Sequence, residues 1–216
     1  MKKLKFILTI SLITSLISCQ PPFTFSEPQP KGTDNLLKFP NQLQGNYISL
    51  SDNSLLTIDD NLIKRVYDFD HKIHASQLDS NSRLVADTIF DLRSNEKTLV
   101  RHEGDSLVYH VYYLDTLFQI NYDNVVRKYR GFYILNKRYD KESWEVKKME
   151  MSKDKLVISS ISTNDEIDNL TAITPIKLDT LQPTKLSATK KQFKEFLKND
   201  GFNDSEIFVP QKRTEL

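Results

Sequence analysis

The sequence predicts a mainly β fold, in which an antiparallel up-and-down meander closes into a barrel or sandwich and is followed by one C-terminal α-helix. Short apolar and β-branched segments recur between residues 43 and 161, with turn signals about every 8–12 residues. The connections between these segments are short, as antiparallel neighbours allow. No unit of about 20–50 residues repeats, which disfavours a solenoid or a propeller.

Residues 1–18 have the pattern of a secretory signal. Three lysines, at positions 2, 3 and 5, precede an apolar run from Phe6 to Ile17. This run is shorter than the about 20 apolar residues that a membrane-spanning helix needs. Basic residues followed by a short apolar run predict a removable signal peptide.

The end of this signal, Leu16-Ile17-Ser18-Cys19, resembles the bacterial lipobox, with leucine three positions before the cysteine and a small residue directly before it. The resemblance implies diacylglycerol transfer to the Cys19 sulfur and cleavage before Cys19. Two or three acyl chains would anchor the protein stably, because each buried methylene contributes about 0.8 kcal/mol. The alternatives are an ordinary secretory signal that ends near a cysteine, or an uncleaved anchor.

Composition restricts the partners of the mature chain. Cys19 is the only cysteine, so an intramolecular disulfide is excluded. The chain has 30 basic and 29 acidic residues, and removal of the three signal lysines leaves a net charge of −2. There is no dense basic run, which argues against binding to nucleic acid. Residues 39–216 are enough for one globular domain with its own core.

Between the signal and this domain, residues 19–38 form a proline-rich segment. Four prolines, at positions 21, 22, 28 and 30, fix φ and remove backbone donors. The pattern predicts an extended, lipidated tether. Phe23 and Phe25 could instead touch the bilayer or dock on the domain.

The expected strands then follow in order. They cover residues 43–50, 55–58, 62–69, 72–78, 82–90, 97–101, 106–114, 117–122, 125–135, 144–151 and 155–161. Turns are expected at residues 51–54 and 59–61, and a hairpin turn at Glu103-Gly104-Asp105. The strand over 106–114 is apolar at both parities, so we expect both of its faces to be covered.

Near the C-terminus the pattern changes to that of a helix. Thr189 and Gln192 fit a capping box. Gly201 is a stop signal, so a helix is expected over 190–200. A shorter helix is also expected from Asn164. The helix over 190–200 has one apolar stripe, made of Phe193, Phe196 and Leu197.

The entry to the first strand, Gly45-Asn46-Tyr47, resembles the lipocalin motif of glycine, any residue and tryptophan, with Tyr47 in place of the tryptophan. Together with the meander and the late helix, it resembles a lipocalin-like β-barrel. The resemblance implies a barrel that holds one small apolar ligand. The lipobox and the glycine-poor composition are similar to those of uncharacterised lipoproteins of Bacteroidota.

Signatures of catalysis and of metal binding are missing from the sequence. Five scattered glycines do not form a phosphate loop, and no serine lies in a hydrolase elbow. Asp68, Asp70 and His71 could gather at a loop around a cation, but solvated polar residues are the simpler interpretation. We therefore expect no catalytic residue, no metal and no cofactor.

Aromatic residues concentrate in the middle third of the chain, and four of them are the candidate ligand-binding residues: Tyr109, Tyr113, Tyr133 and Trp144. Core packing is the alternative role. We expect a non-enzymatic, membrane-tethered binding module for a small apolar ligand or a partner protein. The alternative is a structural or assembly accessory, or an inhibitor, that acts through a surface; a hydrolase is the least favoured class.

The residues after the lipobox bear on the membrane face. Gln20 stands where an aspartate would resemble an inner-membrane retention signal, and the first acidic residue is Glu27. Surface-exported lipoproteins of Bacteroidota typically carry an acidic cluster there. The sequence therefore predicts the outer membrane, facing the periplasm, with the cell surface as the alternative.

Overall fold

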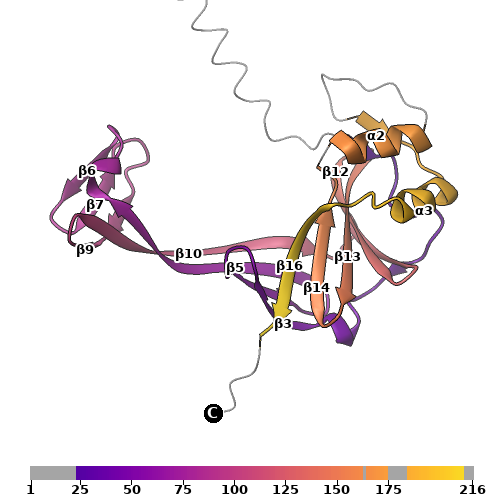
Figure 1. Ribbon diagram of the computed structural model, residues 1–216, viewed down its shortest axis with the longest axis horizontal. Coiled ribbons are helices and arrows are strands. Elements are labelled where there is room, and N and C mark those ends of the chain that lie inside the picture. The colour runs from indigo at the N-terminus through magenta and orange to yellow at the C-terminus, as the bar shows by residue number, and fades with distance from the viewer. Residues whose placement is uncertain (1–22, 163, 175–183, 212–216) are drawn as a thin grey trace, which may run out of the picture.

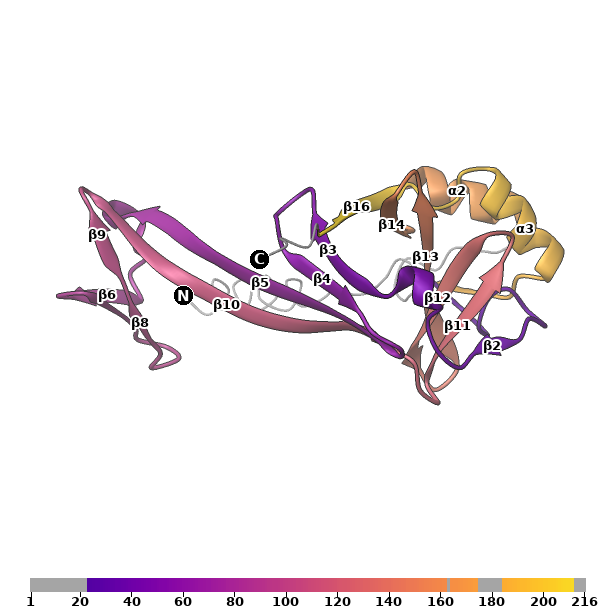
Figure 2. The same cartoon turned by 90° about the horizontal axis from the view of Figure 1, so that it is seen from below.

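The structure is a computed structural model that describes residues 23–162, 164–174 and 184–211. It is mainly β, with antiparallel sheets and two α-helices, so the mainly β, antiparallel part of the prediction is confirmed. A body of curved sheet and helices carries a long two-stranded arm that ends in a small separate sheet (Figures 1 and 2).

The large sheet has the strand order β2-β11-β12-β13-β14-β16-β3-β4-β5-β10-β9. Its strands are β2 (Asn35–Leu36), β3 (Gly45–Ser49), β4 (Leu55–Ile58), β5 (Leu62–His74), β9 (Arg101–Glu103), β10 (Ser106–Gln119), β11 (Asn124–Tyr129), β12 (Phe132–Asp140), β13 (Ser143–Ser152), β14 (Lys155–Ser160) and β16 (Asp204–Pro210). The C-terminal strand β16 lies between β14 and β3, so the order departs from a simple meander. A closed barrel is not found among the described strands, since β10 and β11 are consecutive but unpaired.

The middle strand β12 separates two cores. Tyr133 and Leu135 belong to the core that the curved sheet encloses. Ile134 points the other way, into a second core that contains Phe193 and Phe196 of the C-terminal helix. Because successive residues of a strand face opposite sides, burial on both faces makes the middle of β12 continuously apolar.

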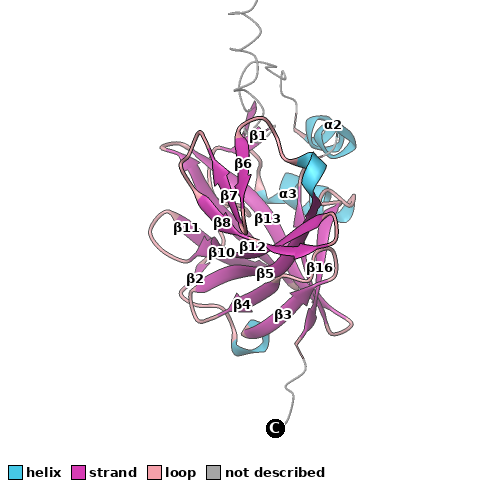
Figure 3. Cartoon of the chain, turned by 90° about the vertical axis from the view of Figure 1, so that its left-hand side faces the viewer, coloured by secondary structure: helices cyan, strands magenta, loops and turns pink. Residues whose placement is uncertain are grey.

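Helices α2 (Asn164–Ile173) and α3 (Lys190–Lys198) lie together at one end of the body (Figures 1 and 3). The predicted capping box of α3 is present: Thr189 N donates to Gln192 Oε1 over 2.9 Å, and Gln192 N donates to Thr189 Oγ1 over 3.3 Å. The helix ends at Lys198, two residues earlier than predicted. The shorter helix begins at Asn164, as predicted.

The tether predicted over 19–38 is folded from residue 23 onward. Strand β1 (Phe23–Phe25) pairs with β13 and with β15 (Thr184–Leu186), and Phe25 is buried in the second core. Gln29 N donates to Asn136 Oδ1, and Asn136 Nδ2 donates back to Gln29 O over 2.9 Å. These contacts with distant strands, which the local proline pattern does not reveal, hold the segment against the body. Residues 1–22, which include Cys19, lie outside the described residues.

The arm consists of the outer parts of β5 and β10. Strand β5 runs without a break across residues 70–71, where the sequence predicts a gap between the strands over 62–69 and 72–78. At the far end, β6 (Ser82–Val85), β7 (Thr88–Asp91) and β8 (Lys97–Leu99) form the tip sheet, next to a 3-10 turn at Ala75–Gln77. The tip has its own small core of Ile89, Val100 and Leu107. In Figure 3 this tip faces the viewer.

Candidate functional site: the aromatic track of the arm

One face of the arm carries a row of rings. Residues directly opposite each other in an antiparallel pair share a face, and successive residues alternate between faces. The Cα partners in β5 and β10 therefore place one set of side chains on the same face, which we call the aromatic track: Tyr67 with Tyr113, Phe69 with Val111, and His71 with Tyr109.

The rings of the track contact one another but remain open to solvent. The ring centroids of Tyr67 and Tyr113 are 6.0 Å apart, and those of His71 and Tyr109 are 5.2 Å apart. The ring centroids of Phe69 and His71 are 6.4 Å apart. Even so, Phe69 is 43% exposed and Tyr113 is 56% exposed. Pre-arranged, half-exposed rings can bury apolar area on binding with little further ordering.

The opposite face of the arm carries His110, Asp68 and Asp70 together with the exposed side chains of Tyr112 and Leu114. His110 Nδ1 lies 3.4 Å from Asp70 Oδ1, and His110 Nε2 lies 3.5 Å from Asp68 Oδ1. His71, which the sequence groups with these two aspartates, points to the other face. Within the described parts of the chain, no three histidine, cysteine, aspartate or glutamate side chains are grouped to hold a metal ion.

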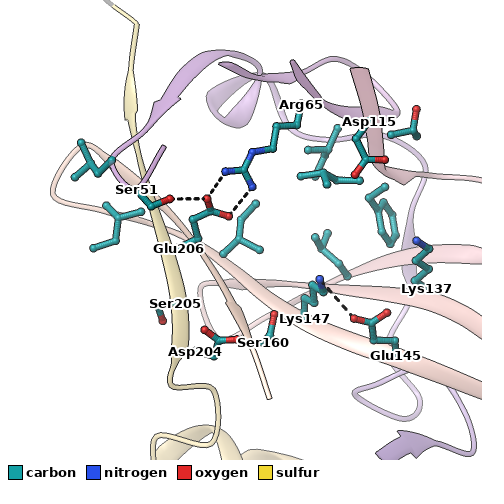
Figure 4. Close-up of a pocket in the computed structure, with 18 residues that line it drawn as sticks. Ser51, Arg65, Asp115, Lys137, Glu145, Lys147, Ser160, Asp204, Ser205 and Glu206 are labelled. Carbon is teal, nitrogen blue, oxygen red and sulfur yellow. Dashed lines mark hydrogen bonds and ion pairs between the residues drawn. The ribbon is translucent and has the colours of Figure 1, made fainter. Parts of the chain in front are cut away.

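At the base of the arm, the same face leads into a cavity of about 760 Å³ (Figure 4). Arg65 and Asp115, the next pair along β5 and β10, line it together with charged residues of the facing strands. These are Lys137, Glu145, Lys147, Asp204 and Glu206. Apolar side chains, among them Ile63, Phe118 and Leu135, complete the lining, so the cavity is of mixed polarity.

Arg65 anchors the base of the arm. Its side chain is almost fully buried and donates to Ser54 Oγ over 2.6 Å, to Asp52 Oδ2 over 2.8 Å and to both carboxylate oxygens of Glu206. Its guanidinium also lies 4.9 Å from the ring centroid of Tyr67, the first member of the track. All of these contacts hold the start of the arm in one orientation.

The charges of this network shift the pKa values of its members. Burial alone would raise the pKa of Asp52, but hydrogen bonds from the Ser54 side chain and backbone and from Arg65 outweigh it and lower the pKa to about 2. Burial would likewise lower the pKa of Arg65, yet the carboxylates of Glu206 and Asp52 raise it above its ordinary value. Asp52 and Arg65 are therefore both charged at neutral pH.

The structure brings together two of the four predicted ligand-binding residues. Tyr109 and Tyr113 lie on the track. Tyr133 is buried in the body, where Gln42 Nε2 donates to its hydroxyl over 2.8 Å. Trp144 packs against Arg138, whose Cζ lies 4.4 Å from the centroid of the Trp144 ring. None of the four lines the cavity.

The sequence analysis missed Tyr67 and Phe69, which complete the track. The available signal was the strict alternation of ring and charge from Tyr67 to Lys72, which is typical of a strand with two different faces. Asp68, Asp70 and His71 are instead interpreted as solvated polar residues or as a cation-binding loop, and the expected strands leave out residues 70 and 71.

The chain matches no protein-family model, no curated protein and no solved structure. Inference about its function therefore starts from its own residues.

Proposed function

We propose that this chain is a lipid-anchored protein of the cell envelope that binds a partner protein through the aromatic track of its arm, without catalysis. The lipobox ending in Cys19 supports the anchor, and the residues after it support the outer membrane, facing the periplasm. None of the described helices is long and apolar enough to cross a bilayer.

The exposed track is the observation that carries this proposal. Tyrosine and phenylalanine offer large apolar area, and they are enriched where proteins bind one another. The cavity has a lining of mixed polarity and contains none of the four candidate ligand-binding residues, so it gives no specific support to the small apolar ligand that a lipocalin-like barrel would hold. A surface that is rigid at its base and aromatic along its length favours an accessory or inhibitor that acts through contact with another protein.

Site-specific photo-crosslinking tests the proposed surface. A photo-reactive phenylalanine analogue replaces Phe69 or Tyr113 of the track in the protein expressed in its own host. Tyr122, which is 90% exposed in the turn after β10, is the matched control position. We expect both track positions to give the same discrete crosslinked species of this chain with a different protein, distinguished by mass spectrometry from a crosslinked pair of copies of this chain, and position 122 to give none. Equal crosslinking at all three positions, or none at the track, contradicts the proposal.

The anchor and the membrane face are tested separately. Mass spectrometry of the mature protein should give an N-terminus at Cys19 that carries acyl chains, and a bare thiol there or an N-terminus upstream contradicts the anchor. Protease treatment of intact cells should leave the protein uncut. Release of the domain would place it on the cell surface instead.

A further inference from the structure

The outer edge of β10 is open along the arm. One side of β10 pairs with β5 over its whole length, but on the other side β9 pairs only with Ser106, Leu107 and Val108. From residue 109 to residue 117, no described strand covers this edge. A free strand edge presents unpaired backbone donors and acceptors to any other strand.

The flanking hydrogen bonds show which backbone groups are free. Ala75 N donates to Asp105 O, and Ile120 N donates to Asn61 O. These two bonds join the residues that directly flank β5 and β10 at the two ends of the pair. Odd-numbered residues of β5 therefore bond to β10, since bonded pairs alternate in an antiparallel ladder. On β10, the residues opposite even-numbered β5 residues point their N–H and C=O outward. Before the bulge near Leu117 these are His110, Tyr112, Leu114 and Thr116.

The two edges of the arm differ in how they are protected. The outward-pointing residues of β5 beyond β4 are Asp68, Asp70 and Lys72, and charged residues discourage pairing with another chain. The outward-pointing residues of β10 carry no aspartate, glutamate, lysine or arginine. Tyr112 and Leu114 are also exposed. The β10 edge is thus open, uncharged and rich in strand-forming residues.

We propose that a second copy of this chain pairs with this edge, β10 antiparallel to β10, about a two-fold axis at Tyr113. In this register Tyr112 lies opposite Leu114 of the second copy, and His110 lies opposite Thr116. All four outward residues of each chain then exchange both backbone hydrogen bonds with their partners. No two like charges face each other, because Asp115 lies opposite Val111.

A second copy fits this edge because the free segment is complementary to itself. The outward residues lie symmetrically about Tyr113, so one closed two-fold contact satisfies both edges at once. The two aromatic tracks then lie on the same face of a four-stranded ribbon, with Tyr113 beside Tyr113 of the second copy. This inference uses the strand edge, whereas the proposed partner site uses the strand face, so either can fail alone.

Cysteine crosslinking in the native envelope tests the register. Tyr113 is opposite itself in a non-hydrogen-bonded pair, where Cβ atoms come within about 4.5–5.5 Å. The chain with Tyr113→Cys should therefore give a disulfide-linked dimer under mild oxidation. In Tyr109→Cys, on the same face of the same strand, the two thiols would be about 27 Å apart, eight residues at 3.4 Å each. That variant should stay monomeric.

Two further variants complete the test. Tyr112→Pro removes an outward N–H and leaves the bonds to β5 intact, so adding it to Tyr113→Cys should abolish the dimer. The unsubstituted chain, whose only cysteine is Cys19, is the control. A disulfide-linked dimer of this chain would show that Cys19 carries a free thiol, which would contradict lipidation but not the pairing. No dimer from Tyr113→Cys, equal dimer from Tyr109→Cys, or a dimer that survives Tyr112→Pro would overturn the two-fold pairing.

Discussion

Replacing Asp52 with asparagine should weaken the folded protein at neutral pH but not in strong acid. The pKa of Asp52 falls from 3.8 to about 2 on folding, and a shift of 1.8 pKa units corresponds to about 2.4 kcal/mol. The Asp52 side chain is 39% exposed, so solvent screening reduces this to about 1 kcal/mol. Because the folded pKa is lowered, the stabilisation is fully present above pH 3.8 and is lost as the pH falls toward 2.

Urea unfolding of the wild-type and Asp52→Asn chains between pH 7 and pH 2 measures this contribution. The free energies of unfolding should differ by about 1 kcal/mol at pH 7 and converge near pH 2. Asp154→Asn, in the turn between β13 and β14, is the matched control, because the Asp154 side chain forms no ion pair or hydrogen bond with the described residues. A difference for Asp52→Asn that stays constant over this pH range would refute the ionic origin of the effect.

Three other substitutions test the packing. Gly201→Ala should destabilise the fold by about 1–3 kcal/mol in urea unfolding, because the new Cβ would lie 2.3 Å from the buried ring of Phe196; an unchanged midpoint contradicts this. Gly131→Ala, at φ +90°, should cost about 1–2 kcal/mol in the same assay, whereas Gly131→Asn should cost less. Leu107→Ala should remove amide hydrogen-exchange protection from the tip sheet and leave β12 protected, and equal loss in both would show that the tip and body unfold together.

The local sequence pattern predicts those elements that depend on residues close together in the sequence. Strand β4 has the predicted bounds, and the capping box of α3 forms as expected, because both depend on residues close in sequence. The strand expected over 125–135 is instead a hairpin, β11 and β12, joined at Arg130 and Gly131. Both residues have positive φ, and of the two only glycine is a recognised turn signal in the sequence. Since both faces of β12 are buried, its apolar run concealed the turn.

Long-range contacts explain the remaining differences. The segment 23–38 reads as a tether because its prolines are local signals, whereas the partner of Gln29, Asn136, is 107 residues away. Tyr109 and Tyr113 share a face because they are four residues apart on β10, whereas Tyr133 and Trp144 belong to β12 and β13 of the body. The gap expected at residues 70–71 interrupts the β5 half of the track between Phe69 and His71.

An isolated two-stranded ribbon is at best marginally stable in water, so the arm needs support at both ends. The base has the buried Arg65 network, and the tip has the core around Leu107, with Ile73 and Tyr109 packed against it. Between these supports the rings at Tyr113 and Phe69 stay exposed, although burying them would stabilise the monomer. A fold that stabilises both ends of a ribbon and leaves its aromatic middle open favours binding as the role of that middle. The tip is then a support for the track, and Leu107→Ala should weaken crosslinking at Tyr113 without a change in the body.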